Sequence, residues 1–127
     1  MPLVRIDLIE GKSAEYRSTI ASVVYDGLRE VMNVPKDDRF MVIAEHRSEN
    51  FIADPNYLDI KRSKDCVFIQ LTLNAGRTLD QKRTFYKAIA DGLNQHIKLR
   101  REDVLINLVE VNKENWSFGN GEAQYAK

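Results

Sequence analysis

The sequence contains one cysteine, two histidines and three prolines, and none of its apolar runs is long enough to span a bilayer. A single cysteine, Cys66, excludes an internal disulfide and favours a reducing compartment, so we expect a cytoplasmic protein. The histidines and the cysteine lack the spacing of metal ligands, so we expect no metal site and no cofactor. The sequence also shows no signal-peptide pattern, and we expect no membrane association.

Neither sign of charge is in excess, because 19 Lys and Arg residues stand against 19 Asp and Glu residues. This balance argues against an extended basic surface, and therefore against nucleic acid as a partner. Apolar residues make up 43% of the chain and charged residues 30%, which is typical of a globular protein. A length of 127 residues predicts a single domain over residues 1–127.

The chain resembles itself when it is shifted by 65 residues. The letters DGL occur at 26–28 and again at 91–93, and GKS at 11–13 corresponds to GRT at 76–78. Apolar residues follow the i, i+3, i+4, i+7 spacing of an amphipathic helix in both halves. These positions are Ile20, Val23, Val24, Gly27, Leu28, Val31 and Met32, with Phe85, Ala88, Ile89, Gly92, Leu93, His96 and Ile97 as their counterparts. Ser13 and Thr78 are the expected N-caps.

Each predicted helix lies between two strand-like segments. LVRIDLI and RFMVIAEH flank the first helix, and CVFIQLTL and VLINLVEV flank the second. A strand, a crossover helix and a second strand form a β-α-β unit whose strands are parallel. We therefore predict an α+β fold in which two β-α-β repeats, about 1–47 and 64–111, form a four-stranded mixed sheet. Both helices cover one face of this sheet, and residues 112–127 form a C-terminal tail.

The other face of the predicted sheet is also apolar. Alternation directs Val4, Ile6, Leu8, Ile69, Leu71 and Leu73 toward the helices. The opposite face carries Leu3, Ile9, Phe40, Val42, Ala44, Phe68, Leu105, Val109 and Val111. That is more apolar surface than a monomer usually exposes, so we expect a homo-oligomer whose subunits cover this face. The alternative is that the C-terminal tail covers it.

The chain begins with Met1-Pro2, and a small second residue usually allows the methionine to be removed. Pro2 would then carry a free secondary amine at the start of the first strand. The parallel second strand begins after Asp37 and Asp38, and an antiparallel third strand would end close to Arg77. The topology therefore predicts that an amine, a carboxylate and a guanidinium meet at one edge of the sheet.

These three groups suit acid–base chemistry on an anion. An α-amino group has a pKa of about 8, so it can act as a base or as an acid. Arg77 can bind a carboxylate in a bidentate manner, and Asp38 would favour the protonated amine. Position 67, which corresponds to Pro2, lies inside the chain, so we expect one site per subunit.

Structural interpretations of the same residues remain open. The two aspartates could end the loop before the second strand, and Arg77 could be a solvated residue of a first helical turn. His46, at a strand end, is expected to have a structural partner. The aromatic residues of the tail could pack at an interface.

The segments MPLVRIDLIEG, VPKDDRF, GRTLDQKRTFYKAIADGL and NWSFGNGEAQY together resemble the tautomerase superfamily, in particular its malonate semialdehyde decarboxylase-like branch. The resemblance covers almost the whole chain. It implies an isomerase or lyase that acts without a cofactor and is typically a homotrimer, with sites near the subunit boundaries.

The resemblance also implies roles for single residues. Pro2 would be the catalytic N-terminal proline, Asp38 the active-site aspartate and Arg77 an arginine that binds the substrate carboxylate. Trp116, Phe118 and Tyr125 would form an apolar wall that excludes water and favours decarboxylation.

One position departs from the pattern of the decarboxylase branch, which has two arginines before the second helix. Ala75 occupies the first of these positions, so malonate semialdehyde is one of several candidate substrates. We expect keto–enol tautomerisation, decarboxylation or hydration of a small oxo acid. The alternative from another class is a non-catalytic oligomeric module that binds a ligand through the same fold.

Overall fold

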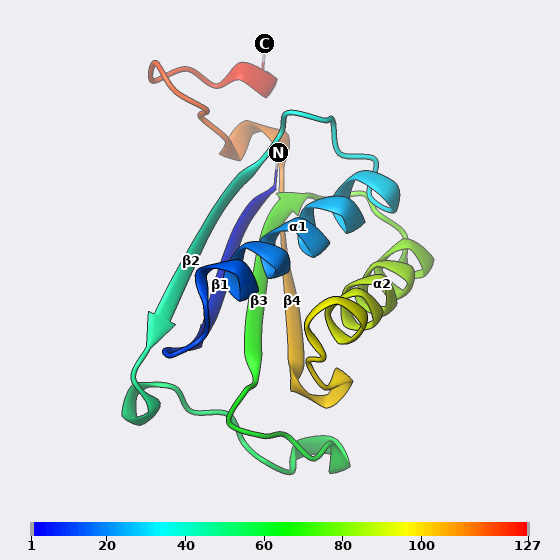
Figure 1. Ribbon diagram of the computed structural model, residues 1–127. Coiled ribbons are helices and arrows are strands. Elements are labelled where there is room, and N and C mark those ends of the chain that lie inside the picture. Colours follow the sequence, from blue (N-terminus) through cyan, green and yellow to red (C-terminus); the bar gives the residue numbers. More distant parts are fainter. Residues whose placement is uncertain (1, 127) are drawn as a thin grey trace.

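A computed structural model describes residues 2–126, and its elements confirm the predicted α+β fold (Figure 1). Two helices cover one face of a four-stranded mixed sheet. In chain order the elements are β1 (Leu3–Ile9), α1 (Ala14–Glu30), β2 (Phe40–His46), β3 (Val67–Asn74), α2 (Leu79–Ile97) and β4 (Val104–Val111). Short 3₁₀ turns occur in the connection between β2 and β3, before and after β4, and in the tail.

The strand order is β2-β1-β3-β4. β1 is parallel to β2 and β3 is parallel to β4, while β1 and β3 form a central antiparallel pair. The two β-α-β halves therefore meet across β1 and β3. An approximate two-fold axis therefore relates the two halves, and the beginning of β1 lies beside the end of β3.

Side chains at the beginning of each helix accept hydrogen bonds from free backbone N–H groups. Ser13 accepts from the N–H of Tyr16 at 3.0 Å, and Thr78 forms a reciprocal capping box with Gln81. Both predicted N-caps are confirmed. No helix among residues 2–126 is long and apolar enough to cross a membrane.

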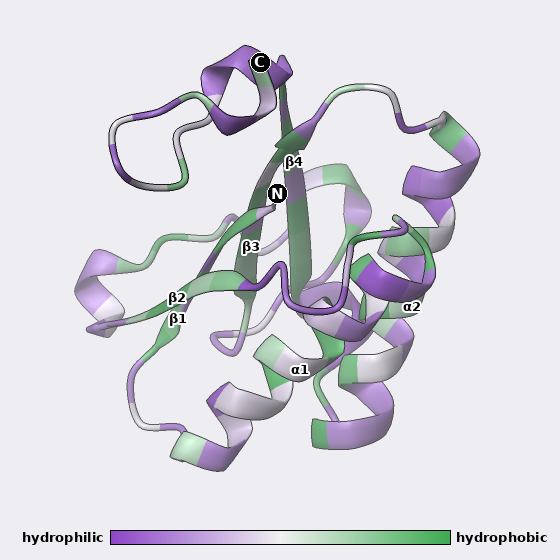
Figure 2. Cartoon of the chain, turned by 90° about the horizontal axis from the view of Figure 1, so that it is seen from above, coloured by the Kyte–Doolittle hydropathy of each residue, from purple (hydrophilic) through white to green (hydrophobic). Residues whose placement is uncertain are grey.

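The helices pack on the sheet with the faces that the repeat predicted. The fully buried side chains include Ile20, Val24 and Leu28 of α1, Phe85, Ile89 and Leu93 of α2, and Val4, Ile6, Leu8, Ile69, Leu71 and Leu73 of the sheet. The strand ribbons are mainly green in the hydropathy colouring, and the outward faces of the helices are largely purple (Figure 2). Burial of these apolar faces is the main stabilising contribution.

The repeated DGL letters mark the place where the two helices approach each other most closely. A Cβ atom at Gly92 would lie 2.8 Å from Cγ1 of Val23, and one at Gly27 would lie 2.8 Å from Cδ1 of Ile89. A real Cβ cannot occupy either place unless its neighbour moves. Glycine therefore permits the helix–helix contact on which the repeat depends.

We expect Gly92→Ala to destabilise the protein, although alanine favours a helix over glycine by about 1 kcal/mol. The added methyl would overlap with the stiff, β-branched Val23, and such overpacking typically costs about 1–3 kcal/mol. Urea denaturation should show a lower midpoint for Gly92→Ala. The double variant Gly92→Ala/Val23→Ala should lose less stability than the sum of the two single variants, and strict additivity would contradict this explanation.

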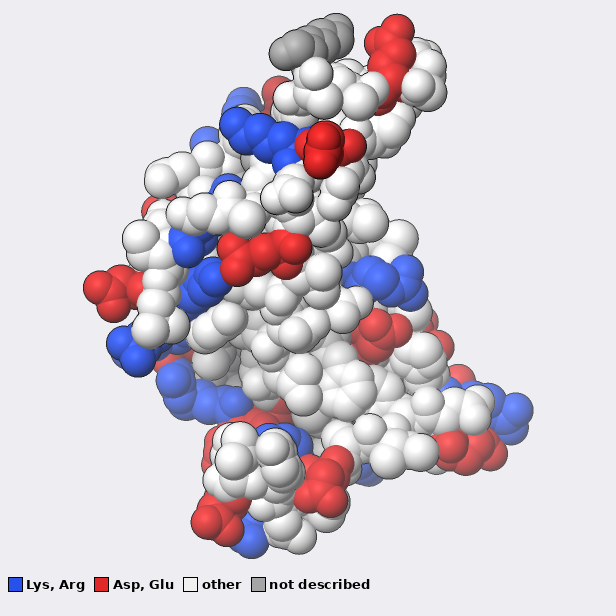
Figure 3. Space-filling view, turned by 180° about the vertical axis from the view of Figure 1, so that it is seen from behind, with Lys and Arg blue, Asp and Glu red and all other residues white. Residues whose placement is uncertain are grey.

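The face of the sheet opposite the helices stays open. Leu3, Phe40, Val42, Leu105 and Val109 are 38–48% exposed. Uncharged atoms occupy the middle of this face in the space-filling view from behind (Figure 3). The tail reaches it through Phe118, whose ring lies 5.9 Å from that of Phe40. The C-terminal tail therefore does not cover this face, contrary to the alternative considered from the sequence.

Candidate functional site at the beginning of β1

Pro2 lies at the edge of the sheet where four segments of the chain meet. It directly precedes Leu3, which pairs with Phe40 of β2 and with Thr72 of β3. Pro2 is buried. β3 ends at the same edge with Asn74, which pairs with Val111 at the end of β4. Figure 1 shows the C-terminal tail leaving β4 close to the beginning of β1.

The two aspartates before β2 differ in their exposure. Asp37 is exposed, whereas Asp38 is half-buried and its Oδ1 atom is inaccessible to solvent. A turn closed by a 3.2 Å hydrogen bond from the Asp38 N–H to the carbonyl of Pro35 directs the chain into β2. Of the two, Asp38 is therefore the aspartate that the fold turns toward the protein interior.

Arg77 is half-buried, and two backbone carbonyls fix its guanidinium. Nη1 donates to the carbonyl of Asn74 at 3.0 Å, and Nη2 donates to the carbonyl of Met32 at 3.1 Å. These bonds connect the end of α1 to the end of β3, so Arg77 has a structural role. A guanidinium has five N–H groups, so this anchoring still leaves donors for an anion.

The tail packs its aromatic side chains over this edge. The rings of Trp116 and Phe118 are stacked, with centroids 5.3 Å apart and an angle of 11°. Tyr125 meets Phe118 edge-on at 5.0 Å. Burial raises the pKa of the Tyr125 phenol, and the negative charge of Asp38 raises this pKa further. Asp38 therefore lies within electrostatic reach of the aromatic cluster.

Asn74 is a site residue that sequence reasoning missed. Its side chain is 6% exposed, and its Oδ1 accepts a 2.8 Å hydrogen bond from the indole N–H of Trp116. This bond fixes the tail to the end of β3. The available signal was a polar residue that ends the apolar strand VFIQLTLN, but nothing in the sequence points from it to Trp116.

The internal repeat provides a comparison for the site. A shift of 65 residues relates Asp38 to Asp103, and Arg77 to Lys12. Asp103 is 1% exposed and accepts hydrogen bonds from Ser63, from its N–H at 2.7 Å and from its hydroxyl at 2.6 Å. Lys12 pairs with Asp65 at 2.9 Å. The segment just before β3 therefore binds both related residues: Ser63 binds the carboxylate of Asp103, and Asp65 binds the ammonium group of Lys12.

By the same shift, Pro2 corresponds to Val67, which directly follows the buried Cys66. Asp103 and Lys12 therefore hold the segment that leads into Val67 in place. That only the place beside Pro2 presents an amine stays a prediction from the repeat.

The remaining reactive side chains lie elsewhere. His46 Nε2 lies 2.7 Å from Oδ1 of Asp7, which confirms a structural partner for this histidine. Cys66 is buried, and this burial raises the pKa of its thiol. Among residues 2–126, no group of three or more His, Cys, Asp or Glu side chains could hold a metal ion.

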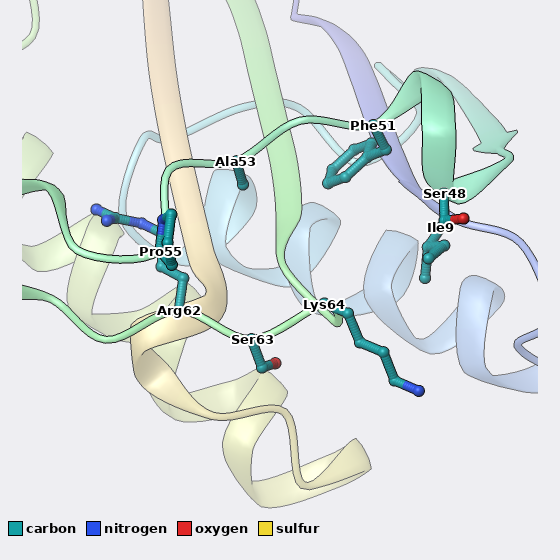
Figure 4. Close-up of a pocket in the computed structure, with 8 residues that line it drawn as sticks. All are labelled: Ile9, Ser48, Phe51, Ala53, Pro55, Arg62, Ser63 and Lys64. Carbon is teal, nitrogen blue, oxygen red and sulfur yellow. The ribbon is translucent and has the colours of Figure 1, made fainter.

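A separate hollow of about 250 Å³ lies at the opposite end of β1, where Ile9 ends the strand. Phe51, Pro55 and Arg62 of the long connection also line it (Figure 4). Arg62 already donates to three backbone carbonyls of this connection. This hollow is therefore separate from the edge that carries Pro2.

Two β-α-β units around a central antiparallel pair, with a proline at the start of β1, define a tautomerase-type enzyme. The chain belongs to the tautomerase family: one family model described as "Tautomerase enzyme" matches residues 38–119, and a second with the same description matches residues 2–60. Probable tautomerase YusQ of Bacillus subtilis (strain 168) is 38% identical over 124 residues, which cover 98% of each chain. Probable tautomerase YrdN of the same strain is 32% identical over 98% of this chain and 96% of its own.

Solved structures place the chain in the malonate semialdehyde decarboxylase-like branch. The FG41 malonate semialdehyde decarboxylase inhibited by 3-bromopropiolate has a TM-score of 0.90 and 39% identity, over 97% of this chain and 93% of the other. A second malonate semialdehyde decarboxylase also has a TM-score of 0.90, with 26% identity, over 97% and 95% of the two chains. A fused 4-OT solved as a symmetric trimer shares the fold, with a TM-score of 0.80 and 17% identity over 98% of both chains.

The surroundings of Tyr125 lead to a pH prediction. The Tyr125 phenol should titrate above its usual pKa of 10.0, because burial and Asp38 both disfavour the phenolate. Asp38→Asn should lower this pKa part of the way toward 10.0, since burial remains. Ultraviolet titration of tyrosinate absorption, with Tyr125→Phe subtracted, measures the difference. An unchanged pKa in Asp38→Asn would show that this carboxylate does not act on Tyr125.

Proposed function

We propose that the protein uses the nitrogen of Pro2, exposed by removal of Met1, as a general acid or base on a small oxo acid. Met1 lies outside the described residues. The observation that carries the proposal is the placement of Pro2, which is buried at the edge to which the fold also brings the inward-turned Asp38. The malonate semialdehyde decarboxylases that resemble the chain support a substrate of this class.

Arg77 would bind the substrate carboxylate with the N–H groups that its two backbone bonds leave free. Trp116, Phe118 and Tyr125 would exclude water, which strengthens every charge interaction inside the site. Position 75 supplies no second cation for the substrate carboxylate, because Ala75 is apolar.

Two mechanisms follow from the protonation state of Pro2. A neutral amine would transfer a proton between carbon and oxygen, which gives keto–enol tautomerisation. A cationic amine stabilised by Asp38 would polarise the substrate carbonyl, which gives decarboxylation or hydration. The half-buried position of Asp38 favours the cationic mechanism, because a nearby carboxylate stabilises the charged amine.

Turnover of the enol of phenylpyruvate, of oxaloacetate and of malonate semialdehyde by the trimmed wild-type enzyme tests the function. We expect conversion of at least one of them, and no conversion of any would support the non-catalytic ligand-binding module. NMR titration of the prolyl nitrogen then separates the mechanisms. A pKa well below neutrality would exclude the cationic mechanism, and a pKa well above it would argue against the base mechanism.

We propose further that the protein is a homotrimer whose subunits cover the open face of each other's sheets. The exposed Leu3, Phe40 and Val42 support this, as does the trimer of the fused 4-OT with the same fold. Val42→Glu would place a charge in this interface, so sedimentation should show the trimer dissociating. Leu58→Glu, at a site that is 72% exposed on the long connection, is the matched control and should remain trimeric. A trimeric Val42→Glu would contradict the proposed interface.

A cytoplasmic location suits this enzyme, because the Cys66 thiol is free and buried. Cell fractionation with antibodies to the protein tests the location, and recovery outside the cytoplasmic fraction would contradict it.

A further inference from the structure

A hollow of about 330 Å³ lies beside the candidate site and shares Arg77 and Asn74 with it. Its wall comes from three parts of the chain: the end of α1 at Met32 and Asn33, the turn between β3 and α2, and Lys113 of the tail. Ala75 and Gly76 form part of this turn and carry no bulky side chain. Space is therefore available next to the guanidinium of Arg77.

The two charged residues that line this hollow are both cations. Among the described residues, Arg77 and Lys113 are the charged ones that line it, and the rest of the lining is uncharged. Lys113 is exposed and forms no ion pair with another of the described residues. The carboxylate of Glu110 lies next to the hollow, where it accepts a backbone hydrogen bond from Gly76 and acts on Arg77, but its 2.6 Å ion pair with Lys82 offsets its charge. The hollow therefore attracts an anion.

The backbone connects Lys113 directly to the aromatic cluster. Lys113 begins the short turn after β4, and its carbonyl accepts the N–H of Trp116 at 3.4 Å. The indole of Trp116 in turn donates to Asn74, which lines the hollow. One turn of the tail thus brings both the ammonium group of Lys113 and the indole of Trp116 to the end of β3.

We propose that Lys113 and Arg77 together bind one carboxylate of the substrate in this hollow, so that Lys113 supplies the second cation of the site. The inference rests on the proposed function for the identity of the ligand, an oxo acid. A small dianion should bind better than a monoanion of similar size, because two cations line the hollow and Glu110, the carboxylate that acts on Arg77, is paired with Lys82. Lys113 is thus a substrate-binding residue that acts on affinity, not on proton transfer.

Binding of malonate to the trimeric protein tests this, measured by the fluorescence of Trp116, the only tryptophan, and by calorimetry at constant ionic strength. Lys113→Gln should raise the Kd for malonate by about tenfold, the order expected for one hydrogen bond to a charged group. Lys113→Arg should restore most of the affinity. Lys64→Gln, an exposed lysine at the opposite end of the sheet, is the matched control and should bind as the wild type does.

With a substrate that is turned over, Lys113→Gln should raise KM and leave kcat nearly unchanged. An unchanged malonate Kd in Lys113→Gln, or an equal loss in Lys64→Gln, would overturn the inference while leaving a Pro2-dependent activity intact. Conversely, a Lys113-dependent Kd in a protein that turns over none of the oxo acids would retain the anion site and refute the proposed function.

Discussion

Pro2→Ala is expected to lower kcat/KM by about 10²–10⁴, the usual contribution of a positioned general acid or base. Alanine is also small, so Met1 should still be removed and a primary amine should remain. The pyrrolidine ring fixes the direction of the amine's lone pair relative to Cα, and the freely rotating primary amine of alanine lacks this constraint. The loss of kcat/KM therefore measures what the positioned secondary amine contributes to catalysis. Progress curves with whichever of the three oxo acids is converted fastest provide kcat/KM for both proteins.

Two controls separate this chemistry from a change in folding. Urea denaturation should show that Pro2→Ala keeps most of its stability, because Pro2 precedes β1 and proline has no N–H to donate to the ladder. Mass spectrometry should confirm that both proteins have lost Met1, since a retained methionine converts the amine into an amide. A Pro2→Ala enzyme that works within about twofold of the wild type would remove the proline from the mechanism.

The fold was predictable because its determinants are local and are repeated. Alternating apolar residues in the four strands fixed which face each strand buries, and Ser13 and Thr78 lie where free N–H groups begin each helix. The shift of 65 residues then predicted two β-α-β units, and a four-stranded sheet allows few ways to join them. The exposed face of the sheet followed from the same alternation.

The interior of the site was less predictable, because its contacts join residues that are far apart in the sequence. The bond between Asn74 and Trp116 spans 42 residues, and that between Arg77 and the carbonyl of Met32 spans 45. No local pattern encodes such pairs. The same limit applies to Lys113, which looks like any solvated lysine until the tail brings it to the hollow that Arg77 also lines.

The two related aspartates should respond in opposite ways to the same substitution. Asp38→Asn should lower kcat/KM by about 10²-fold, because the amide cannot stabilise a cationic Pro2, and should leave stability nearly unchanged. Asp103→Asn should instead cost about 2 kcal/mol, because the amide's NH₂ group cannot accept from Ser63 and one of two buried donors loses its acceptor. Folded Asp103→Asn should keep full activity.

Urea denaturation and steady-state kinetics on both variants test whether Asp38 acts in catalysis and Asp103 in stability. Each variant is the control for the other. The repeat gives both aspartates the same place in a β-α-β unit, so the contrast isolates what differs between them. Asp103 holds Ser63 of the segment before β3, whereas Asp38 lies at the edge of the sheet that carries Pro2. If Asp38→Asn lost stability and kept its activity, Asp38 would be a second structural aspartate, and the cationic mechanism would lose its counter-ion.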